Sequence, residues 1–162
     1  KIHHKIANCR QDRLHWISNR ISQNHAMVVL EDLKVSNMSK SAKGSLDSPG
    51  KNVKAKAGLN KSILDQGWSM FASMLEYKQH WRGGEVVYVP PHHTSQTCPS
   101  PSCGHVSANN RKTQSSFECE SCGYADNADV VGAINILARG HRVLAYGESA
   151  LADSVKQEPI AA

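Results

Sequence analysis

Four of the five cysteines in the chain form two close pairs. The second pair is a C-x-x-C sequence, Cys119 and Cys122, and the first is a wider C-x-x-x-x-C sequence, Cys98 and Cys103. Fifteen residues separate the pairs and a glycine follows each one, a spacing typical of zinc ribbons. Four thiolates around Zn²⁺ leave no open coordination position, so the predicted ion is structural.

Two disulfides are the alternative arrangement for these cysteines. No secretory leader opens the sequence, so we expect a cytoplasmic protein whose thiols stay reduced, which favours zinc. Because so small a ribbon has almost no apolar core, the metal must supply its folding free energy, about 10–16 kcal/mol in comparable peptides. The fifth cysteine, Cys9, falls in a helical pattern and is interpreted as a small core residue.

Two carboxylates stand where an α/β fold places functional groups. Glu31 follows the apolar run 27–30, which predicts a buried parallel strand that ends there. Asp129 falls in the first turn of a predicted helix, with Asp126 as its expected N-cap. Acids at a strand end and a helix start can converge on a divalent cation. Taken singly, each position is more often a solvated acid or one that complements the helix dipole.

The elements that must position these side chains follow from hydrophobic periodicity. It predicts three helices, over residues 1–23, 59–81 and 126–139. It also predicts two strands, over residues 27–30 and 85–89. Gly83 and Gly140 are expected to end the second and third helices. The segment 36–58, rich in Ser and Lys, is expected to be a mobile loop.

This order of elements indicates an α/β fold with a parallel sheet. Two strands are too few for a stable sheet, so we expect the sheet to be incomplete. The chain begins with Lys1, which suggests that it was cut from a longer protein. The longest uninterrupted apolar run, residues 26–30, is far shorter than the roughly 20 residues of a membrane-spanning helix, so we expect no membrane partner.

Positive charge is concentrated in the first half of the chain. Of its 162 residues, 1–82 hold 14 Lys and Arg against 6 acids, whereas 83–162 hold 5 against 8. Seven lysines and one acid lie between Lys34 and Lys61. Such a basic half favours a polyanionic partner, because each phosphate that it neutralises releases counterions. The alternative is a flexible loop kept soluble by its lysines.

Several separated motifs resemble the C-terminal half of the TnpB (OrfB) family. They occur in the family's order, and they read VLEDL (29–33), LNKSI (59–63), PHHTSQTC (91–98), NRKTQ (110–114) and DVVGAINIL (129–137). These are insertion-sequence proteins long regarded as transposases, with implied roles in DNA recombination and transposition. They are now understood as RNA-guided DNA endonucleases related to type V CRISPR effectors.

The resemblance implies a partial RNase H-like, RuvC-like nuclease core formed by residues 1–94 and 125–142. A zinc ribbon at 95–124 would be inserted before the last helix, and residues 143–162 would form a loose tail. The resemblance also implies three acids that bind Mg²⁺ and cut DNA. Glu31 matches the second of them and Asp129 matches the third. The run Thr94-Ser95-Gln96 matches the lead into the first cysteine pair and is interpreted as structural.

We assign the nucleic-acid contacts to five basic residues, Lys34, Lys40, Lys43, Arg111 and Lys112. The expected partners are DNA and, in the complete protein, a guide RNA. The family's first cysteine pair is usually C-x-x-C, so the wider spacing here can loosen that turn. No strand-borne Asp before the first helix matches the family's first catalytic acid, so this chain alone is expected not to cut DNA.

Three hypotheses remain open from the sequence. The chain is part of a metal-dependent, RNA-guided endonuclease, or a transposon remnant that only binds nucleic acid through a zinc-containing fold. The third hypothesis, an unrelated zinc-ribbon module, is disfavoured by the ordered motifs.

Overall fold

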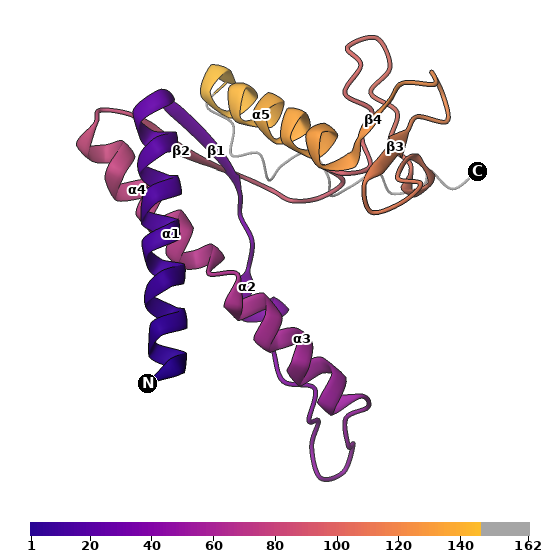
Figure 1. Cartoon of the computed structure of the whole chain (residues 1–162). Coiled ribbons are helices and arrows are strands. Elements are labelled where there is room, and N and C mark those ends of the chain that lie inside the picture. The colour runs from indigo at the N-terminus through magenta and orange to yellow at the C-terminus, as the bar shows by residue number, and fades with distance from the viewer. Residues whose placement is uncertain (147–162) are drawn as a thin grey trace. The chain divides into compact units, whose positions relative to one another are not determined.

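The computed structural model describes residues 1–146, and it divides into two compact units. The first unit comprises residues 1–28 and 33–86, and the second comprises 29–32 and the chain from residue 87 onward. Figure 1 shows the elements in order along the chain. They are α1 (Ile2–Asn24), β1 (Met27–Glu31), α2 (Val35–Met38), α3 (Val53–Asp65), α4 (Trp68–Trp81), β2 (Glu85–Val89), a short 3₁₀ turn η1 (Ala108–Asn110), β3 (Ser116–Glu118), β4 (Ala125–Asn127) and α5 (Ala128–Tyr146).

Helices α1 and α4 pack together to form the core of the first unit. Leu75 and Met74 of α4 are buried in it. Lys78 is buried too, and its ammonium donates to the carbonyl oxygen of His15 and to Ser18 Oγ, both at 2.7 Å. Burial, with a smaller contribution from the charge of Arg82, lowers the pKa of Lys78. The two hydrogen bonds offset part of the cost of burying this amine.

The predicted single helix over 59–81 is wrong, because two helices occupy this region. Helix α3 ends at Asp65 and α4 begins at Trp68. Between them Gly67 adopts the left-handed conformation, with φ of 70°, which a residue with a side chain adopts only at a cost. The apolar spacing of the two helices happens to run on through this break.

The predicted mobile loop over 36–58 is helical only at its two ends, and residues 39–52 between them belong to no helix or named strand. It begins within α2 and ends within α3, and an isolated bridge pairs Gly44 with Pro49. Two side chains of α3 hold the end of α2. Lys56 Nζ donates to the carbonyl oxygen of Met38 at 2.6 Å, and Asn60 Nδ2 donates to that of Ser39 at 2.8 Å.

Strands β1 and β2 form a two-stranded sheet, as predicted. Glu85 N donates to the oxygen of Ala26, and Asp32 N donates to that of Val89. The bonds advance along both strands in the same direction, so the pair is parallel. Val89 is buried, whereas β1 is half-buried along its length rather than fully buried.

The second unit contains an antiparallel hairpin of β3 and β4, in which Phe117 pairs with Asp126. Asp126 is therefore a strand residue. The prediction that it is the N-cap of α5 is wrong. Asn127 provides the cap, because its Oδ1 accepts from the N–H groups of Asp129 at 2.9 Å and of Val130 at 3.4 Å. The prediction placed the start of the helix two residues too early.

Gly140 does not end α5, which continues to Tyr146. It is buried, and a Cβ built on it would lie 2.3 Å from Val29 Cγ2. The glycine therefore serves close packing of α5 on β1 rather than helix termination. Residues 143–146 of the expected loose tail are helical, and the rest of that tail lies outside the described residues.

Two further sequence interpretations concern Cys9 and membrane contact. Cys9 is exposed on α1, so it is not a core residue. Within residues 1–146, no helix is long and apolar enough to cross a membrane.

A matched pair of substitutions in α5 tests the role of Gly140. We expect Gly140→Ala to destabilise the fold by about 1–3 kcal/mol, because the new methyl overpacks against Val29. Gly132 lies in the same helix with nothing within 4 Å of an added Cβ. Gly132→Ala should therefore stabilise the fold by about 0.5–1 kcal/mol through helix propensity. Urea unfolding of both variants measures this, and equal stabilisation by the two would contradict the assignment.

Candidate metal centre

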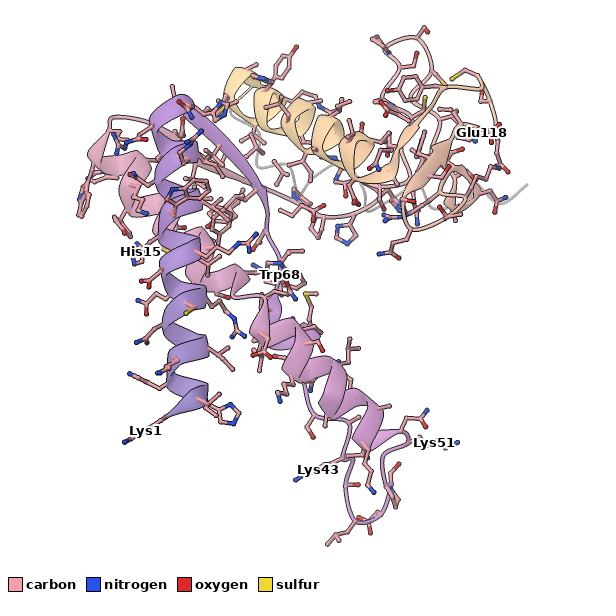
Figure 2. All side chains as sticks on the ribbon, viewed as in Figure 1. Lys1, His15, Lys43, Lys51, Trp68 and Glu118 are labelled. Carbon is pink, nitrogen blue, oxygen red and sulfur yellow. The ribbon has the colours of Figure 1, made fainter. Side chains whose placement is uncertain are left out.

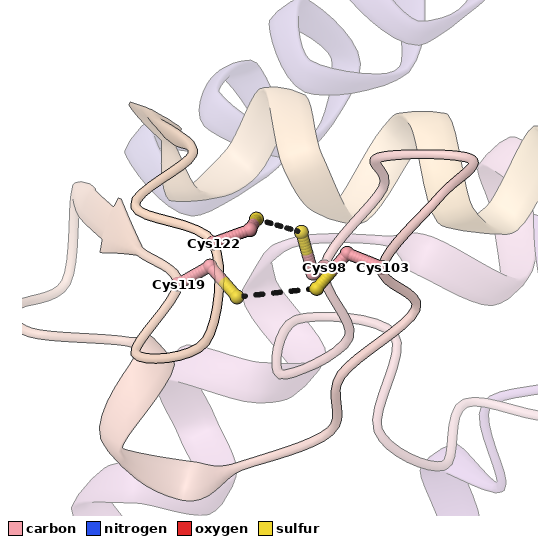
Figure 3. Close-up of side chains that lie close together, drawn as sticks. All are labelled: Cys98, Cys103, Cys119 and Cys122. Carbon is pink, nitrogen blue, oxygen red and sulfur yellow. Dashed lines mark hydrogen bonds between the residues drawn. The ribbon is translucent and has the colours of Figure 1, made fainter.

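The four predicted cysteines converge in the second unit. Their sulfur atoms all lie within 4.8 Å of one another, and this is the one cluster of three or more potential metal ligands among residues 1–146. Figure 3 shows the facing pairs, Cys98 with Cys122 at 3.6 Å and Cys103 with Cys119 at 3.7 Å between sulfurs. A tetrahedron with Zn–S bonds of 2.3 Å has edges of about 3.8 Å. The cluster therefore fits a metal such as zinc. The sulfurs are too far apart for disulfides, and all four thiols are free.

Backbone hydrogen bonds shape a turn around each cysteine pair. In the first, Cys103 N donates to the carbonyl oxygen of Ser100 at 3.0 Å. In the second, Gly123 N donates to the oxygen of Cys119 at 2.9 Å, and Cys119 N donates to that of Tyr124 at 2.8 Å. The glycines that follow the pairs, Gly104 and Gly123, have φ of 61° and 73°. A positive φ explains why glycine is favoured there.

The two buried thiols have opposite acidities. Burial raises the pKa of Cys98 to about 12. Burial also opposes ionisation of Cys119, but hydrogen bonds from the backbone N–H groups of Cys122 and Ser121 outweigh it and lower the pKa to about 6. The backbone hydrogen bonds thus favour the thiolate form of Cys119, which is the form that binds metal.

Asn110 joins the two cysteine turns. It is fully buried, and its Nδ2 donates to the carbonyl oxygens of Gln96 at 2.9 Å and His105 at 3.2 Å. Its Oδ1 accepts from Glu120 N at 3.0 Å. This amide therefore satisfies backbone groups on both sides of the metal centre. No local sequence pattern indicated this role, although Asn110 opens the NRKTQ motif.

A small apolar cluster lies beneath the sulfurs. Phe117 and Val131 pack with Ala128 and the buried cysteines, and Tyr124 meets Phe117 edge-on with ring centroids 6.4 Å apart. So small a cluster contributes little burial free energy. A metal held by the four sulfurs would then contribute much of the stability of the ribbon.

Replacing Asn110 tests its role in supporting the centre. We expect Asn110→Ala to weaken zinc affinity by about 10–100-fold, because partners that fix the ligand turns have effects of this size. Asn109→Ala is the matched control, since Asn109 is exposed. Competition with a chromophoric chelator measures both affinities. Equal affinities would show that the amide does not support the centre.

Chelation should unfold the ribbon and spare the first unit. We expect a strong chelator to abolish amide protection at residues 95–124, while the fluorescence of Trp16, Trp68 and Trp81, all in the first unit, stays unchanged. Cys119→Ser should do the same, and Cys9→Ser should not. Hydrogen exchange followed by NMR resolves the two regions. A ribbon that stays protected without metal would refute a metal-stabilised fold.

Glu31, the first predicted acid, is held by hydrogen bonding at the end of β1. Its Oε1 accepts from the hydroxyl of Thr94 at 2.7 Å. Thr94 is itself buried, and its carbonyl oxygen accepts from Asn135 Nδ2 of α5 at 2.8 Å. Thr94, interpreted as structural, thus touches a predicted functional acid. Asn135 was missed as well, although it lies in the quoted DVVGAINIL motif.

Asp129, the second predicted acid, has a different environment. Its side chain is 83% exposed in the first turn of α5, and its Oδ1 lies 3.7 Å from Arg111 Nη2. Asp129 precedes Asn135 by six residues, or about 9 Å along a helix axis. No metal-binding group of three or more side chains within residues 1–146 includes Glu31 or Asp129. Their joint role in metal binding therefore stays a prediction.

The five predicted nucleic-acid contacts divide between the two units. Lys34, Lys40 and Lys43 are exposed in the first unit, and Figure 2 labels Lys43 on the loop between α2 and α3. In the second unit, Arg111 Nη2 donates to the carbonyl oxygen of Gln114 at 2.7 Å, and Lys112 Nζ lies 3.9 Å from Glu120 Oε1. Their role in binding nucleic acid stays a prediction.

Comparisons with known proteins agree on one group of relatives. Residues 68–136 match the family model described as Cas12f1-like, TNB domain. A protein of Escherichia coli (strain K12), named as an RNA-guided DNA endonuclease, InsQ, is 58% identical over 160 residues, which are 98% of this chain and 39% of that protein. The TnpB-like protein MJ0012 of Methanocaldococcus jannaschii is 29% identical over 84% of this chain and 57% of its own length.

A solved structure shares the fold. The Cas12f1 chain of a Cas12f1–sgRNA–target DNA complex aligns with a TM-score of 0.56 and 23% identity, over 83% of this chain and 35% of that one. The chain thus spans less than two-thirds of the length of each of these relatives. The likeness supports the α/β architecture.

Proposed function

Because this chain belongs to the TnpB family, we propose that it forms part of a transposon-associated, RNA-guided DNA endonuclease. Glu31 and Asp129 are the proposed Mg²⁺ ligands within a RuvC-like, RNase H-like core. The four cysteines are proposed to hold a structural zinc ion. The observation that carries this proposal is the hydrogen bond from Thr94 to Glu31, at 2.7 Å. It fixes a carboxylate at the carboxyl end of a parallel strand, where open α/β sheets place their sites.

Each proposed side chain has a task that follows from its surroundings. Thr94 donates to one oxygen of Glu31 and thereby orients the other oxygen toward a cation. Asp129 presents an exposed carboxylate at the start of α5. When bound, Mg²⁺ activates water and stabilises the leaving oxygen in phosphodiester cleavage.

We propose that Arg111 contacts the DNA backbone close to Asp129 instead of neutralising that carboxylate. Their charged atoms lie 3.7 Å apart and the carboxylate is largely exposed, so the ion pair contributes little free energy. The guanidinium can therefore leave Asp129 for a phosphate oxygen of the DNA. Lys112 lies next to it on the same ribbon segment, between the cysteine pairs.

The proposed partners are DNA and a guide RNA. The names of the relatives support both, since one is an RNA-guided DNA endonuclease and another was solved with sgRNA and target DNA. The lysines between residues 34 and 61 provide the positive charge that a phosphate backbone requires.

Cleavage of plasmid DNA by the whole protein with its guide RNA tests the proposal. We expect Glu31→Gln and Asp129→Asn each to reduce the rate by at least about 1,000-fold, because either change removes a proposed ligand of the catalytic metal. Thr94→Val, which removes only the orienting hydroxyl, should reduce it about 10–100-fold. Glu118→Gln, at an exposed site on β3, is the control and should retain full activity.

Two results would contradict this assignment. One is full cleavage by Glu31→Gln or Asp129→Asn. The other is DNA cleavage by the isolated 162-residue chain, if Glu31→Gln abolishes it. Glu31 and Asp129 would then suffice for catalysis without a third acid. Nucleic-acid binding without any cleavage by the whole protein would favour the remnant hypothesis instead.

A further inference from the structure

The outer face of α1 carries an exposed tryptophan between two arginines. Trp16 is 63% exposed. Arg13 precedes it by three residues and Arg20 follows it by four, so the three side chains share one face of the helix. Ser18 lies on the opposite face, where it is fully buried and accepts a hydrogen bond from Lys78 of α4. The face that carries Trp16 therefore points away from the interface between α1 and α4.

Arg20 is already placed against the ring of Trp16. Its Cζ lies 5.4 Å from the centroid of the indole, within the range of a cation–π contact. Arg20 is itself exposed, so its N–H groups remain accessible to a phosphate. Proteins that bind single strands use an aromatic ring to stack a base and basic side chains to contact the backbone. Trp16 and Arg20 bring these two groups together on the surface of one helix.

The charge of α1 favours a polyanion as the occupant of this face. Residues 2–24 hold four Lys and Arg against one acid, Asp12. Lys5, Arg13 and Arg20 are all exposed. A second copy of this chain would bring an equally basic α1 to the face, and like charges in contact oppose association. A phosphate backbone is attracted instead, because the cations that neutralise it release its counterions.

We propose that this face of α1 binds single-stranded nucleic acid through one unpaired base and the phosphates on either side of it. The base stacks on the indole of Trp16, and Arg13 and Arg20 contact the phosphates. Neither stacking nor phosphate contact reads the sugar, so strands of RNA and DNA bind alike. The base pairs of a duplex are stacked on one another and cannot make this contact. The inference rests on the proposed function for its class of partner.

Titration of the ¹⁵N-labelled, zinc-loaded chain with hexamers of uridine or of deoxythymidine tests the proposal. The indole N–H signals of Trp16, on α1, and of Trp68 and Trp81, on α4, report on each ring separately. We expect both hexamers to shift the signal of Trp16, and a short DNA duplex to leave it in place. Trp16→Ala should weaken the affinity for either hexamer at least about fivefold, because stacking of one base on an aromatic ring has effects of this size.

Trp81→Ala is the matched control for the loss of an exposed indole. Trp81 is 77% exposed, and its ring meets that of Tyr77 at 4.8 Å between centroids. Its loss should leave the affinity for the hexamers unchanged. Since Trp16 and Trp81 are both largely exposed, each variant should keep the amide spectrum of the folded parent chain.

The salt dependence of binding tests the two arginines. Arg13→Gln and Arg20→Gln should each reduce the slope of the logarithm of affinity against the logarithm of salt concentration by about 0.7, the value for one phosphate contact on a single strand. Asp12→Asn should strengthen binding, because Asp12 lies one turn before Trp16 and repels a phosphate there. An unchanged slope in both arginine variants would contradict the proposed phosphate contacts.

Four further results would overturn the proposal. The first is an unshifted Trp16 signal with both hexamers at millimolar concentration, and the second is unchanged affinity in Trp16→Ala. The third is an equal shift with the duplex, which would show that charge alone is recognised, and the fourth is binding of only one hexamer. None of these results depends on Glu31, Asp129 or DNA cleavage, so failure here is distinct from failure of the proposed endonuclease function.

Discussion

The second unit depends on the hydrogen bonds that join Thr94 to Glu31 and to Asn135. Its hydroxyl donates to Glu31 at the end of β1, and its carbonyl oxygen accepts from Asn135 of α5. Asn135 also donates to the carbonyl oxygen of Thr97, next to the first metal-binding cysteine. One buried turn thus connects a strand end, a helix and the start of the ribbon. Because these polar groups are buried, losing any one partner leaves another unsatisfied.

The ribbon and α5 are stabilised by different physical means. The ribbon has four sulfurs over a small apolar cluster and an internal amide, Asn110, so a metal held by the sulfurs would contribute much of its stability. Helix α5 has close packing, with Gly140 against Val29, and a hydrogen bond from Arg139 to the carbonyl oxygen of Pro90 at 2.7 Å. The start of α5, which carries Asp129, follows directly from β4 of the ribbon. Unfolding of the ribbon would therefore displace Asp129.

The sequence predicted the features that depend on composition and spacing. Cysteine spacing identified the metal centre, and apolar runs identified both parallel strands. Predictions from the sequence were wrong where the same residue type can have two structural roles. Gly140 was interpreted as a helix stop, whereas it allows close packing, and Gly67 was counted within a helix that it interrupts. The roles of Thr94 and Asn135 require tertiary contacts across about 40–60 residues, which no local pattern encodes.

We propose that Glu31 and Asp129 hold the same divalent cation, and Mn²⁺ can replace Mg²⁺ to test this by NMR. In the zinc-loaded chain, we predict paramagnetic broadening of the amides at 31–32 and 128–130 over the same range of Mn²⁺ concentration. Glu31→Gln should then abolish the broadening at 128–130 as well, because one ion serves both acids. Broadening at Asp129 that persists unchanged in Glu31→Gln would contradict the account.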